Sequence, residues 1–569
     1  MKNKEIIIWG AGKIGRGFIA DLAQAGEYKI TFVDADEALV KELNAKKAYS
    51  VCKFASSAQK EVIKVSGFDA MHTSEAKPLL EKLVQGELLA LAVFPESFNE
   101  VGLKLSQVIG ERIARKIEKP LDILICTNIA NSETILKKYI IENLNGEALQ
   151  YFNTWVGLIG SIVIRMAVKP EKEHLEKDKL VVVTNGYPEL IADKSAFKGE
   201  LPAMPGMVFT ENILVQEKRK MYTYNMLHAL YAYIGFAKGY EFVYECTTDA
   251  EINRIANYAL DEIKKGLLKE YNFSAEDMDL WNKRVLQNMA NPILKDRLIR
   301  VGGDAARKLK REDRLVGAAL LCRQNGVLPY FITMAIAYGY LFKTAEDPAS
   351  LKIDKHIKKY GLKRAVVEFS QLSYEPDLVQ LIFEHYSRAL KGETHQFSIN
   401  KINKLKFAFE RGFYNEKKYR GCGQCAIKGL LEVLDSQDDV LFQATSGLSG
   451  GGALCNDGSC GGYIAGILLM SKIVGRRLEQ MLVDGDKEAQ YRSYTMAQKL
   501  HDKFIDTYGS VVCKDIHERI FGQWFCLREK AVRDRFEIAG AHLDKCTSVI
   551  GVSVTWVTEI LIEEGFIKV

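Results

Sequence analysis

The segment that most restricts the fold of this chain is a glycine-rich turn near its N-terminus, GAGKIGRG at residues 10–17. Gly10, Gly12 and Gly15 follow the short apolar run Glu5–Trp9 and open a stretch with helical spacing. In this arrangement the first glycine permits a tight turn, the second lets the backbone approach a pyrophosphate, and the third brings the helix close to the strand. The pattern predicts a dinucleotide-binding α/β unit at the start of the chain.

The next strand-like run ends in an acid, Asp34. A carboxylate at this place can accept hydrogen bonds from both hydroxyls of an adenosine ribose, and its charge repels a 2′-phosphate, so we expect NAD rather than NADP. A helix N-terminus supplies amide donors for the pyrophosphate. The expected cofactor-binding residues are therefore Gly10, Gly12, Lys13, Ile14, Gly15 and Asp34. The alternative is a glycine-rich turn that binds no nucleotide. It is disfavoured because the strand, the helix and the terminal acid follow one another at the spacing of the fingerprint.

The chain has 569 residues, more than one hydrophobic core usually holds, so several domains are expected. We expect an α/β protein with an N-terminal Rossmann domain (1–205), a mostly helical substrate domain (206–390), a linker (391–401) and a helical cysteine-rich domain (402–569). In the first domain, helical stretches separate short apolar runs that are typical of buried parallel strands. These runs are Glu5–Trp9, Ile30–Ala35, Glu87–Phe94 and Leu121–Asn128.

Composition and charge exclude two broad classes of partner. The formal net charge is only +5 and the chain has no long basic run, so we expect no nucleic acid. The most apolar stretch, Tyr463–Met470, is much shorter than the roughly 20 residues of a membrane-spanning helix. The N-terminus leads directly into the glycine-rich turn and does not have the features of a signal peptide. We therefore expect a cytoplasmic protein without a membrane partner, and reduced thiols.

Longer motifs now identify a family resemblance. GAGKIGRGFIADL resembles the opening of mannitol-1-phosphate 5-dehydrogenases, a group within the polyol-specific long-chain dehydrogenase (mannitol dehydrogenase) family. The spacing Lys-x4-Asn-x2-His, the catalytic signature of that family, occurs at Lys220, Asn225 and His228. The resemblance covers roughly residues 1–390 and continues through ICTN (125–128), residues 218–235, NPILKDRLIRVG (291–302), RKL (307–309) and EDPASL (346–351).

The resemblance assigns roles that the chemistry of these residues supports. It implies that Lys220 is the general base, that Asn128 and Asn225 form an oxyanion hole, and that His228 orients the substrate oxygen. On an ideal α-helix, Asn225 and His228 lie about 140° and 80° round from Lys220, so all three can face one cleft. A lysine becomes a usable base when desolvation or a neighbouring cation lowers its pKa, and asparagine amides can stabilise an alkoxide. Without the resemblance, a solvated lysine and a core histidine would be the simpler interpretation.

The reaction implied by the resemblance is the NAD-dependent interconversion of a polyol or polyol phosphate and its ketose, with mannitol 1-phosphate and fructose 6-phosphate as the expected pair. Arg307 and Lys308 are candidate phosphate ligands, because a guanidinium fork suits a phosphate. A solvated helix face is the alternative for these two charges. The expected partner is a small polyol or sugar phosphate.

Three departures from the family pattern leave the substrate open. Thr127, Gly160 and Ile164 stand where the family commonly has acids. An acid near the catalytic lysine would help to set its charge and to hold polyol hydroxyls. A reductase of sugar acids of the tagaturonate or fructuronate type is therefore an alternative. A non-catalytic NAD(H)-sensing redox protein is another, although it would not need Lys220, Asn225 and His228 together.

The last 148 residues hold seven of the chain's 11 cysteines. Their Gly/Cys pattern resembles the C_GCAxxG_C_C family, whose members are described as redox-active. CxxC spacing at Cys422 and Cys425 suits metal or cluster ligation or dithiol exchange. We therefore expect a metal or iron–sulfur centre or a redox dithiol, with buried free cysteines as the alternative. The candidates are Cys422, Cys425, Cys455, Cys460, Cys513, Cys526 and Cys546, with His517 and His542 as further potential ligands.

Overall fold

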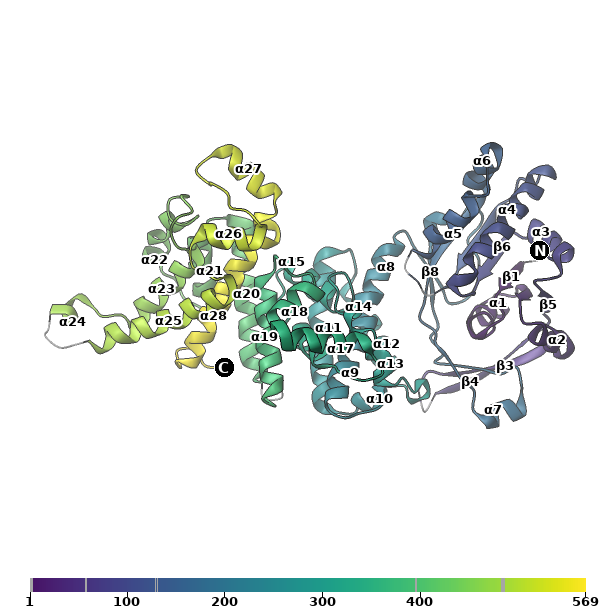
Figure 1. Cartoon of the computed structure of the whole chain (residues 1–569), viewed down its shortest axis with the longest axis horizontal. Coiled ribbons are helices and arrows are strands. Elements are labelled where there is room, and N and C mark those ends of the chain that lie inside the picture. The colour runs from purple at the N-terminus through teal and green to yellow at the C-terminus, as the bar shows by residue number, and fades with distance from the viewer. Residues whose placement is uncertain (1–3, 57–58, 128, 130, 394–396, 483–486) are drawn as a thin grey trace. The chain divides into compact units, whose positions relative to one another are not determined.

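The computed structural model describes residues 4–56, 59–127, 129, 131–393, 397–482 and 487–569 (Figure 1). They form two compact units. The first comprises Met1–Lys220 and Arg284–Lys295, and the second comprises Met221–Lys283 and Asp296–Val569. The predicted linker at 391–401 includes residues 394–396, which lie outside the described residues.

An eight-stranded sheet forms the centre of the first unit, and the predicted α/β fold is confirmed. Neighbouring strands are parallel except β8 and β11, which run antiparallel. Short apolar strands covered on both faces are typical of such sheets. The order is β12 (Met207–Thr210), β11 (Leu190–Asp193), β8 (Val156–Val163), β7 (Leu121–Ile125), β6 (Leu88–Leu91), β1 (Glu5–Trp9), β2 (Lys29–Asp34) and β5 (Asp69–His72).

Alternating side chains of the strands fill two hydrophobic cores, one on each face of this sheet. On β1, Ile6 and Ile8 belong to one core and Ile7 and Trp9 to the other. Because successive side chains of a strand point to opposite faces, a strand buried on both faces is apolar throughout. The first core includes α1 (Ala20–Ala25) and α2 (Glu37–Lys46); the second includes α3 (Ala76–Gln85), α4 (Phe98–Ala114), α5 (Ser132–Ile141) and α6 (Gly146–Trp155).

A second sheet of four strands adds to the first core, and the sequence did not predict it. Tyr49, Val51 and Val65 of this sheet pack among the side chains of the first core. Most residues of its edge strand are polar or exposed, so the apolar signal is weak. The order is β4 (Lys60–Ser66), β3 (Ala48–Phe54), β10 (Val182–Thr184) and β9 (Ala167–Val168). α7 (Lys172–Lys177) lies between the last two strands along the chain.

The second unit is helical, as predicted for both of its parts. The described helices up to residue 390 include α9 (Met226–Ala237), α11 (Ala250–Glu270), α13 (Leu298–Gly302), α15 (Val316–Gln324), α16 (Tyr330–Leu341), α17 (Pro348–Tyr360), α18 (Leu362–Phe369) and α19 (Pro376–Leu390). Those after it include α20 (Ile399–Tyr419), α21 (Cys422–Val433), α22 (Asp439–Ala444), α23 (Gly461–Val474), α24 (Leu478–Leu482), α25 (Glu488–Tyr508), α26 (Cys513–Phe521), α27 (Lys530–Ile538) and α28 (Cys546–Glu563). α12 (Ala275–Met289) contributes residues to both units.

Glycines allow three helices of the C-terminal part to pack closely. A Cβ atom at Gly412 of α20 would lie 2.8 Å from the carbonyl oxygen of Ile550, and one at Gly551 of α28 would lie 3.0 Å from the Phe409 ring. A Cβ atom at Gly429 of α21 would lie 3.2 Å from the amide nitrogen of Gly412. Interiors are packed as densely as organic crystals, so a side chain at these crossings would force the helices apart.

A buried ion cluster joins the C-terminal helices to the earlier ones within the second unit. The Arg323 guanidinium on α15 donates to both carboxylate oxygens of Asp377 on α19, at 2.7 and 3.0 Å. It also lies 3.4 Å from the carboxylate of Asp544, which belongs to the π-helical turn η7 (Ala541–Lys545) before α28. The Arg323 side chain is only 1% exposed, so these acids balance a charge that has left water.

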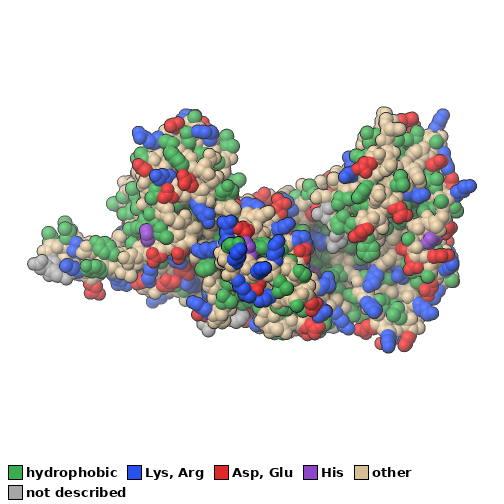
Figure 2. Space-filling view, viewed as in Figure 1, with side chains coloured by type: hydrophobic (Ala, Val, Ile, Leu, Met, Phe, Trp, Pro, Cys, Tyr) green, Lys and Arg blue, Asp and Glu red, His purple; other side chains and the backbone are tan. Residues whose placement is uncertain are grey.

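One described helix, Ala541–Glu563, has the length and apolar composition to cross a membrane. Of its most apolar window, 78% is buried inside the protein, as in the core helix of a globular unit. On the face shown in Figure 2, acidic and basic side chains are interspersed. This agrees with the small net charge of the chain.

Candidate functional site

The glycine-rich turn after β1 has the form that the sequence predicts. Gly10 has a φ of +103°, a conformation that glycine adopts freely. A Cβ atom at Gly10 would lie 2.4 Å from the carbonyl oxygen of Ala92, and one at Gly15 would lie 1.9 Å from that of Gly10. A Cβ atom at Gly12 would meet nothing within 4 Å. The fold thus requires glycine at 10 and 15, whereas Gly12 leaves the backbone open to an approaching group.

The helix that follows the turn begins with a π-helical segment, η1 (Gly15–Ile19), rather than a regular α-helix. The Arg16 side chain donates to the carbonyl oxygen of Ala11 at 2.7 Å. The Tyr49 hydroxyl donates to the carbonyl oxygen of Arg16 at 2.8 Å. Lys13 is exposed and Ile14 is partly buried. These contacts fix the turn while leaving its outer residues accessible.

Asp34 lies at the end of β2, beside the same turn. Its Oδ2 accepts a hydrogen bond from the Ala11 amide at 2.7 Å, and its Oδ1 accepts one from the Asp36 amide at 2.9 Å. Because the side chain is partly buried and held by two amides, its carboxylate has a fixed position next to the glycines. This is the arrangement expected of an acid that binds the ribose of a dinucleotide.

Lys220 is the last residue of α8 (Ile213–Lys220) in the first unit. Its ammonium group donates to the carbonyl oxygen of Val163, the last residue of β8, at 3.0 Å. Parallel strands of α/β sheets usually present their binding sites at this carboxyl end. The base predicted from the sequence therefore lies at an edge of the sheet where binding sites commonly form.

Two acids near Lys220 were missed by the sequence analysis. Burial raises the pKa of Glu217, the Glu133 carboxylate raises it further, and Lys220 opposes both effects. Glu133 lies over β8, because a Cβ atom at Gly160 would be 3.5 Å from its Oε2. Glu217 precedes Lys220 by three residues and so shares its helix face, a spacing that could have revealed it. Glu133 is brought there only by tertiary packing.

The three departures from the family pattern occupy ordered positions in the first unit. The Thr127 hydroxyl donates to the carbonyl oxygen of Val93 at 2.9 Å, and Ile164 is buried. Gly160 leaves room for Glu133. Carboxylates are therefore present near Lys220 although these three positions do not supply them.

Asn225 and His228 lie in the second unit, and each has a described contact there. Asn225 ends a π-helical turn, η4 (Met221–Asn225), and its amide donates to the Met221 sulfur at 3.4 Å. Because this turn is π-helical, the ideal-helix angles predicted from Lys220 do not apply. His228 lies 3.5 Å from Asp296 and packs edge-on against Tyr224. Asn128, the other predicted oxyanion-hole residue, lies outside the described residues.

The partners of Asp296 lower its pKa by more than burial raises it. Burial alone would raise the pKa of this carboxyl, but the nearby His228 and the charge of Arg300 lower it overall. Asp296 is 6% exposed. A buried carboxylate thus lies next to the His228 ring.

The predicted phosphate ligands are both held by contacts within the protein. Arg307 donates to Asp304 at 2.5 Å and to Asp313 at 3.1 Å. The Lys308 ammonium group is buried and donates to the carbonyl oxygens of Val301 and Gly303. Burial, followed by the charges of Arg314 and Arg307, lowers the pKa of Lys308 to about 8. A phosphate here would have to displace these partners.

The structure divides the seven C-terminal cysteines into two groups. Four of them line one cavity of about 350 Å³, together with Glu416, His517 and His542. The thiol of Cys425 instead donates to the backbone carbonyls of Asn415 and Arg420, and that of Cys455 to the carbonyl of Ala453. The four cysteines at the cavity are Cys422, Cys460, Cys513 and Cys546; Cys425, Cys455 and Cys526 are absent from its described lining.

Burial is the largest cause of the pKa shifts of the four cavity cysteines and of His517. It raises the pKa of Cys422 to about 12 and that of Cys460 to about 11, and raises that of Cys513 and Cys546 further. Cys460 also raises the pKa of Cys422, and both raise that of Cys513; all three raise that of Cys546, so the four thiols lie within electrostatic reach of one another. Burial lowers the pKa of His517 to about 4. Within the described ranges, no three histidine, cysteine or acidic groups are arranged to hold a single metal ion.

Comparison with known proteins accounts for both parts of the chain. The mannitol dehydrogenase Rossmann domain matches residues 4–206, and the mannitol dehydrogenase C-terminal domain matches residues 212–388. The mannitol-1-phosphate 5-dehydrogenase of Caldanaerobacter subterraneus subsp. tengcongensis is 31% identical over 387 residues, which is 68% of this chain and 98% of that protein. The chain belongs to the mannitol dehydrogenase family.

A second relative and two solved structures are also similar to the first two thirds of the chain. The mannitol-1-phosphate 5-dehydrogenase of Thermoanaerobacter pseudethanolicus is 32% identical over 66% of this chain and 96% of its own length. Among solved structures, a D-sorbitol dehydrogenase in substrate-free form has a TM-score of 0.61 at 13% identity, over 69% of this chain and 95% of that one. Pseudomonas fluorescens mannitol 2-dehydrogenase, in complex with NAD and D-mannitol, has a TM-score of 0.53 at 16% identity, over 69% and 93%. These likenesses confirm the fold of the mannitol dehydrogenase part.

The residues beyond the mannitol dehydrogenase part match a second family. Residues 421–560 match C_GCAxxG_C_C, described as "Putative redox-active protein". All four cysteines that line the cavity fall within this match. The predicted fusion of the two families is confirmed.

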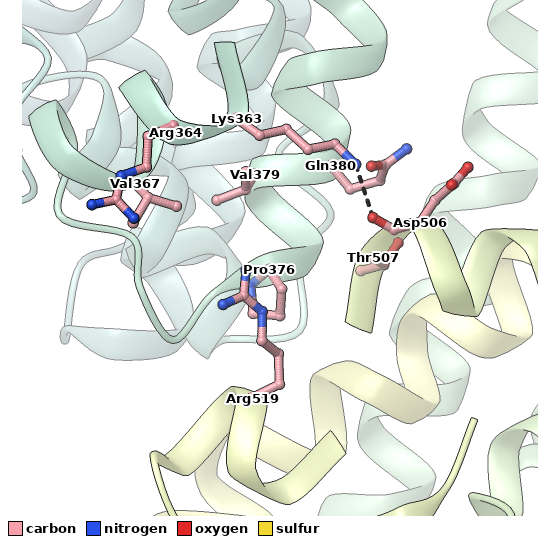
Figure 3. Close-up of a pocket in the computed structure, with 9 residues that line it drawn as sticks. All are labelled: Lys363, Arg364, Val367, Pro376, Val379, Gln380, Asp506, Thr507 and Arg519. Carbon is pink, nitrogen blue, oxygen red and sulfur yellow. Dashed lines mark hydrogen bonds between the residues drawn. The ribbon is translucent and has the colours of Figure 1, made fainter. Parts of the chain in front are cut away.

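A smaller cavity, of about 220 Å³, lies between the mannitol dehydrogenase C-terminal domain and the cysteine-rich region (Figure 3). Lys363 of α18 donates to the carbonyl oxygen of Asp506 of α25 at 2.8 Å across it. Arg364 and Arg519 also line it. Its described lining includes no residue that the sequence predicted as a site.

Proposed function

We propose that the chain is an NAD-dependent dehydrogenase that interconverts a polyol or polyol phosphate and its ketose, with Lys220 as the general base. The observation that carries this proposal is the position of the Lys220 ammonium group against Val163 at the end of β8, in a chain of the mannitol dehydrogenase family. A lysine at the carboxyl ends of the strands, where substrates commonly bind, can exchange a proton with a substrate hydroxyl.

NAD fits the residues around the glycine-rich turn. The open side of Gly12 would admit the pyrophosphate, the backbone at Gly10, Lys13, Ile14 and Gly15 would surround it, and Asp34 would bind the adenosine ribose. When bound, NAD supplies the acceptor for the hydride that leaves the carbinol carbon. The negative charge of Asp34 favours NAD over NADP.

The protein's own groups would handle the proton and the oxygen of the substrate. Lys220 takes the hydroxyl proton during oxidation, and the amides of Asn225 and Asn128 donate to the oxygen as negative charge develops. His228, held by Asp296, orients the same oxygen. The role of Asn128 rests on the family resemblance alone, and those of Lys220, Asn225 and His228 on the family signature together with their described contacts.

The substrate proposed first is mannitol 1-phosphate, with fructose 6-phosphate as the product. The support is that the relatives with 31% and 32% identity are named mannitol-1-phosphate 5-dehydrogenases. Arg307 and Lys308 remain the proposed phosphate ligands, and a phosphate would exchange with Asp304 and Asp313 at Arg307. A small sugar phosphate as the partner and a cytoplasmic location are part of the same proposal.

A substrate panel followed by NADH absorbance tests this proposal. The panel contains mannitol 1-phosphate, mannitol, other hexitol phosphates and, in the reducing direction, tagaturonate and fructuronate. We expect the highest kcat/KM with a polyol phosphate and its ketose. Preference for a sugar acid, or no turnover in the whole panel despite NADH binding, would contradict the proposed reaction.

A further inference from the structure

Three of the four cysteines at the C-terminal cavity lie at the N-termini of helices. Cys422 is the first residue of α21, Cys513 is the first residue of α26, and Cys460 is the N-cap of α23. Cys546 lies where the π-helical turn η7 passes into α28. Three helix N-termini thus bring their partial positive charges to one cavity, which favours an anionic group there.

Hydrogen-bond donors point at two of these sulfurs. The Gly450 amide lies 3.4 Å from the Cys422 sulfur, and the Asn456 side-chain amide lies 3.5 Å from the Cys513 sulfur. Glycine is required nearby, because a Cβ atom at Gly461 would lie 2.4 Å from the Cys422 sulfur. Donors to thiolate sulfurs are a common feature of protein-bound metal clusters, where they tune the charge on sulfur.

The cavity wall also contains buried polar atoms whose hydrogen-bonding capacity is unused. Glu416 and His517 are each 2% exposed, and both line the cavity. Neither Oε2 of Glu416 nor Nδ1 of His517 has a hydrogen-bond partner among the described residues. The Nε2 atom of His517 lies 3.6 Å from the Cys513 sulfur and 3.9 Å from that of Cys546. The other oxygen of Glu416 lies 3.4 Å from His542, whereas the unused nitrogen of the buried His517 ring can donate to an anionic group in the cavity.

The size of the cavity restricts what this ligand can be. A single Zn²⁺ ion bound by sulfur at about 2.3 Å draws its ligands to within about 4 Å of each other. No such group of three exists in the part of the chain that the structure describes, and the four cysteines instead surround a space of about 350 Å³. Four thiols around a space this large suit a group of several atoms.

We infer that Cys422, Cys460, Cys513 and Cys546 are the ligands of an iron–sulfur cluster in this cavity. Four cysteine thiolates are the usual ligand set of such clusters. Each thiol gives up its proton as iron binds. The helix N-termini and the Gly450 and Asn456 donors then stabilise the negative charge. His517 acts as a positioning residue for Cys513 and Cys546. This inference is independent of the proposed dehydrogenase function.

The test uses the full-length protein, purified without oxygen and reconstituted with iron salts, sulfide and a thiol reductant. We expect iron and acid-labile sulfide in equal amounts, up to four of each per chain, with visible absorption that bleaches on reduction. Electron paramagnetic resonance of the reduced protein distinguishes a binuclear from a cubane cluster. A chain that retains no iron and sulfide after reconstitution, or that holds one zinc ion without sulfide, would overturn the inference.

Matched cysteine variants locate the cluster. Cys513→Ser and Cys460→Ser should lose most of the iron and sulfide, whereas Cys425→Ser and Cys526→Ser should keep them. Circular dichroism and NADH binding show whether each variant folds. If the first two variants fail to fold, the wild-type iron and sulfide content still decides for or against the cluster. Equal retention of iron and sulfide in all four folded variants would show that the cavity is not the site.

Discussion

The imidazole Nε2 of His228 lies 3.5 Å from the carboxylate Oδ2 of Asp296, with both side chains largely buried in the second unit. Asp296 also bonds Arg300, and its lowered pKa keeps it ionised at neutral pH. The negative charge of Asp296 attracts the His228 ring nitrogen that faces it and so favours this ring orientation.

If His228 orients the substrate as proposed, Asp296→Asn should lower kcat by about 10- to 100-fold, because small displacements of such a group are costly. Steady-state kinetics with the best polyol substrate measures the loss. Arg300→Gln is the control, since it removes the exposed partner of Asp296 and leaves His228 in contact. An Asp296→Asn enzyme with wild-type kcat would show that His228 needs no such support.

Lys220→Ala should lower kcat by about 10²- to 10⁴-fold, the usual contribution of a general base. NADH binding, followed by fluorescence, should change little, because Lys220 has no proposed contact with the glycine-rich turn. Lys218→Ala, two residues earlier on the same helix and exposed, is the matched control. Should the two alanine variants retain similar rates, Lys220 is not the base.

Glu217→Gln should stabilise the protein at neutral pH. Burial and Glu133 raise the pKa of Glu217 above its unfolded value, so the unfolded chain loses this proton first and stability falls as pH rises through that range. The glutamine variant avoids this loss, so its melting temperature should exceed that of the wild type at pH 7, and the difference should shrink near pH 4. A lower melting temperature at pH 7 would contradict the proposed electrostatic cost.

Asp34→Ser should weaken the preference for NAD and improve the use of NADP. The carboxylate beside the Ala11 amide would no longer bind the ribose hydroxyls or repel a 2′-phosphate. The ratio of kcat/KM for the two cofactors measures the change. Wild-type activity that already favours NADP would contradict the role given to Asp34.

Arg323→Met should lower the free energy of unfolding by about 3–5 kcal/mol, because it leaves the carboxylates of Asp377 and Asp544 in a buried site without their cation. Chemical denaturation of the full chain measures this. Arg364→Met is the control: its exposed pair with Glu368 should contribute less than about 1 kcal/mol. Equal losses in both variants would show that burial of Arg323 has no special cost.

The sequence predicts elements well where one local pattern determines them. β1 matches the predicted run, and β2 and β7 differ from theirs by a few residues, because buried parallel strands are apolar throughout. The sheet formed by β3, β4, β9 and β10 was not predicted, since β4 is largely exposed and β9 has only two residues.

The predicted site residues also divide into those that a local sequence pattern reveals and those that only tertiary packing brings together. The tight turn at Gly10 and Gly15 and the position of Asp34 at the end of β2 could be predicted because they follow from a short sequence pattern. Glu133 reaches the vicinity of Lys220 only through the packing of α5 on β8, which no local spacing reveals. The choice of four cysteines out of seven likewise depends on which helix ends meet at one cavity.

The Arg323 cluster also bears on how this gene fusion can evolve. Two mannitol-1-phosphate 5-dehydrogenases similar to this chain match only about two thirds of it. In this chain, Asp544 of the cysteine-rich region shares one buried arginine with Asp377 of the dehydrogenase region. A frameshift or deletion that removed the last region would take Asp544 away from the ion cluster and expose Arg323 and Asp377 to water. Selection would then act against the truncated product through its loss of stability, even in cells that have no use for the cysteines. Packing alone can thus make a fused region difficult to lose.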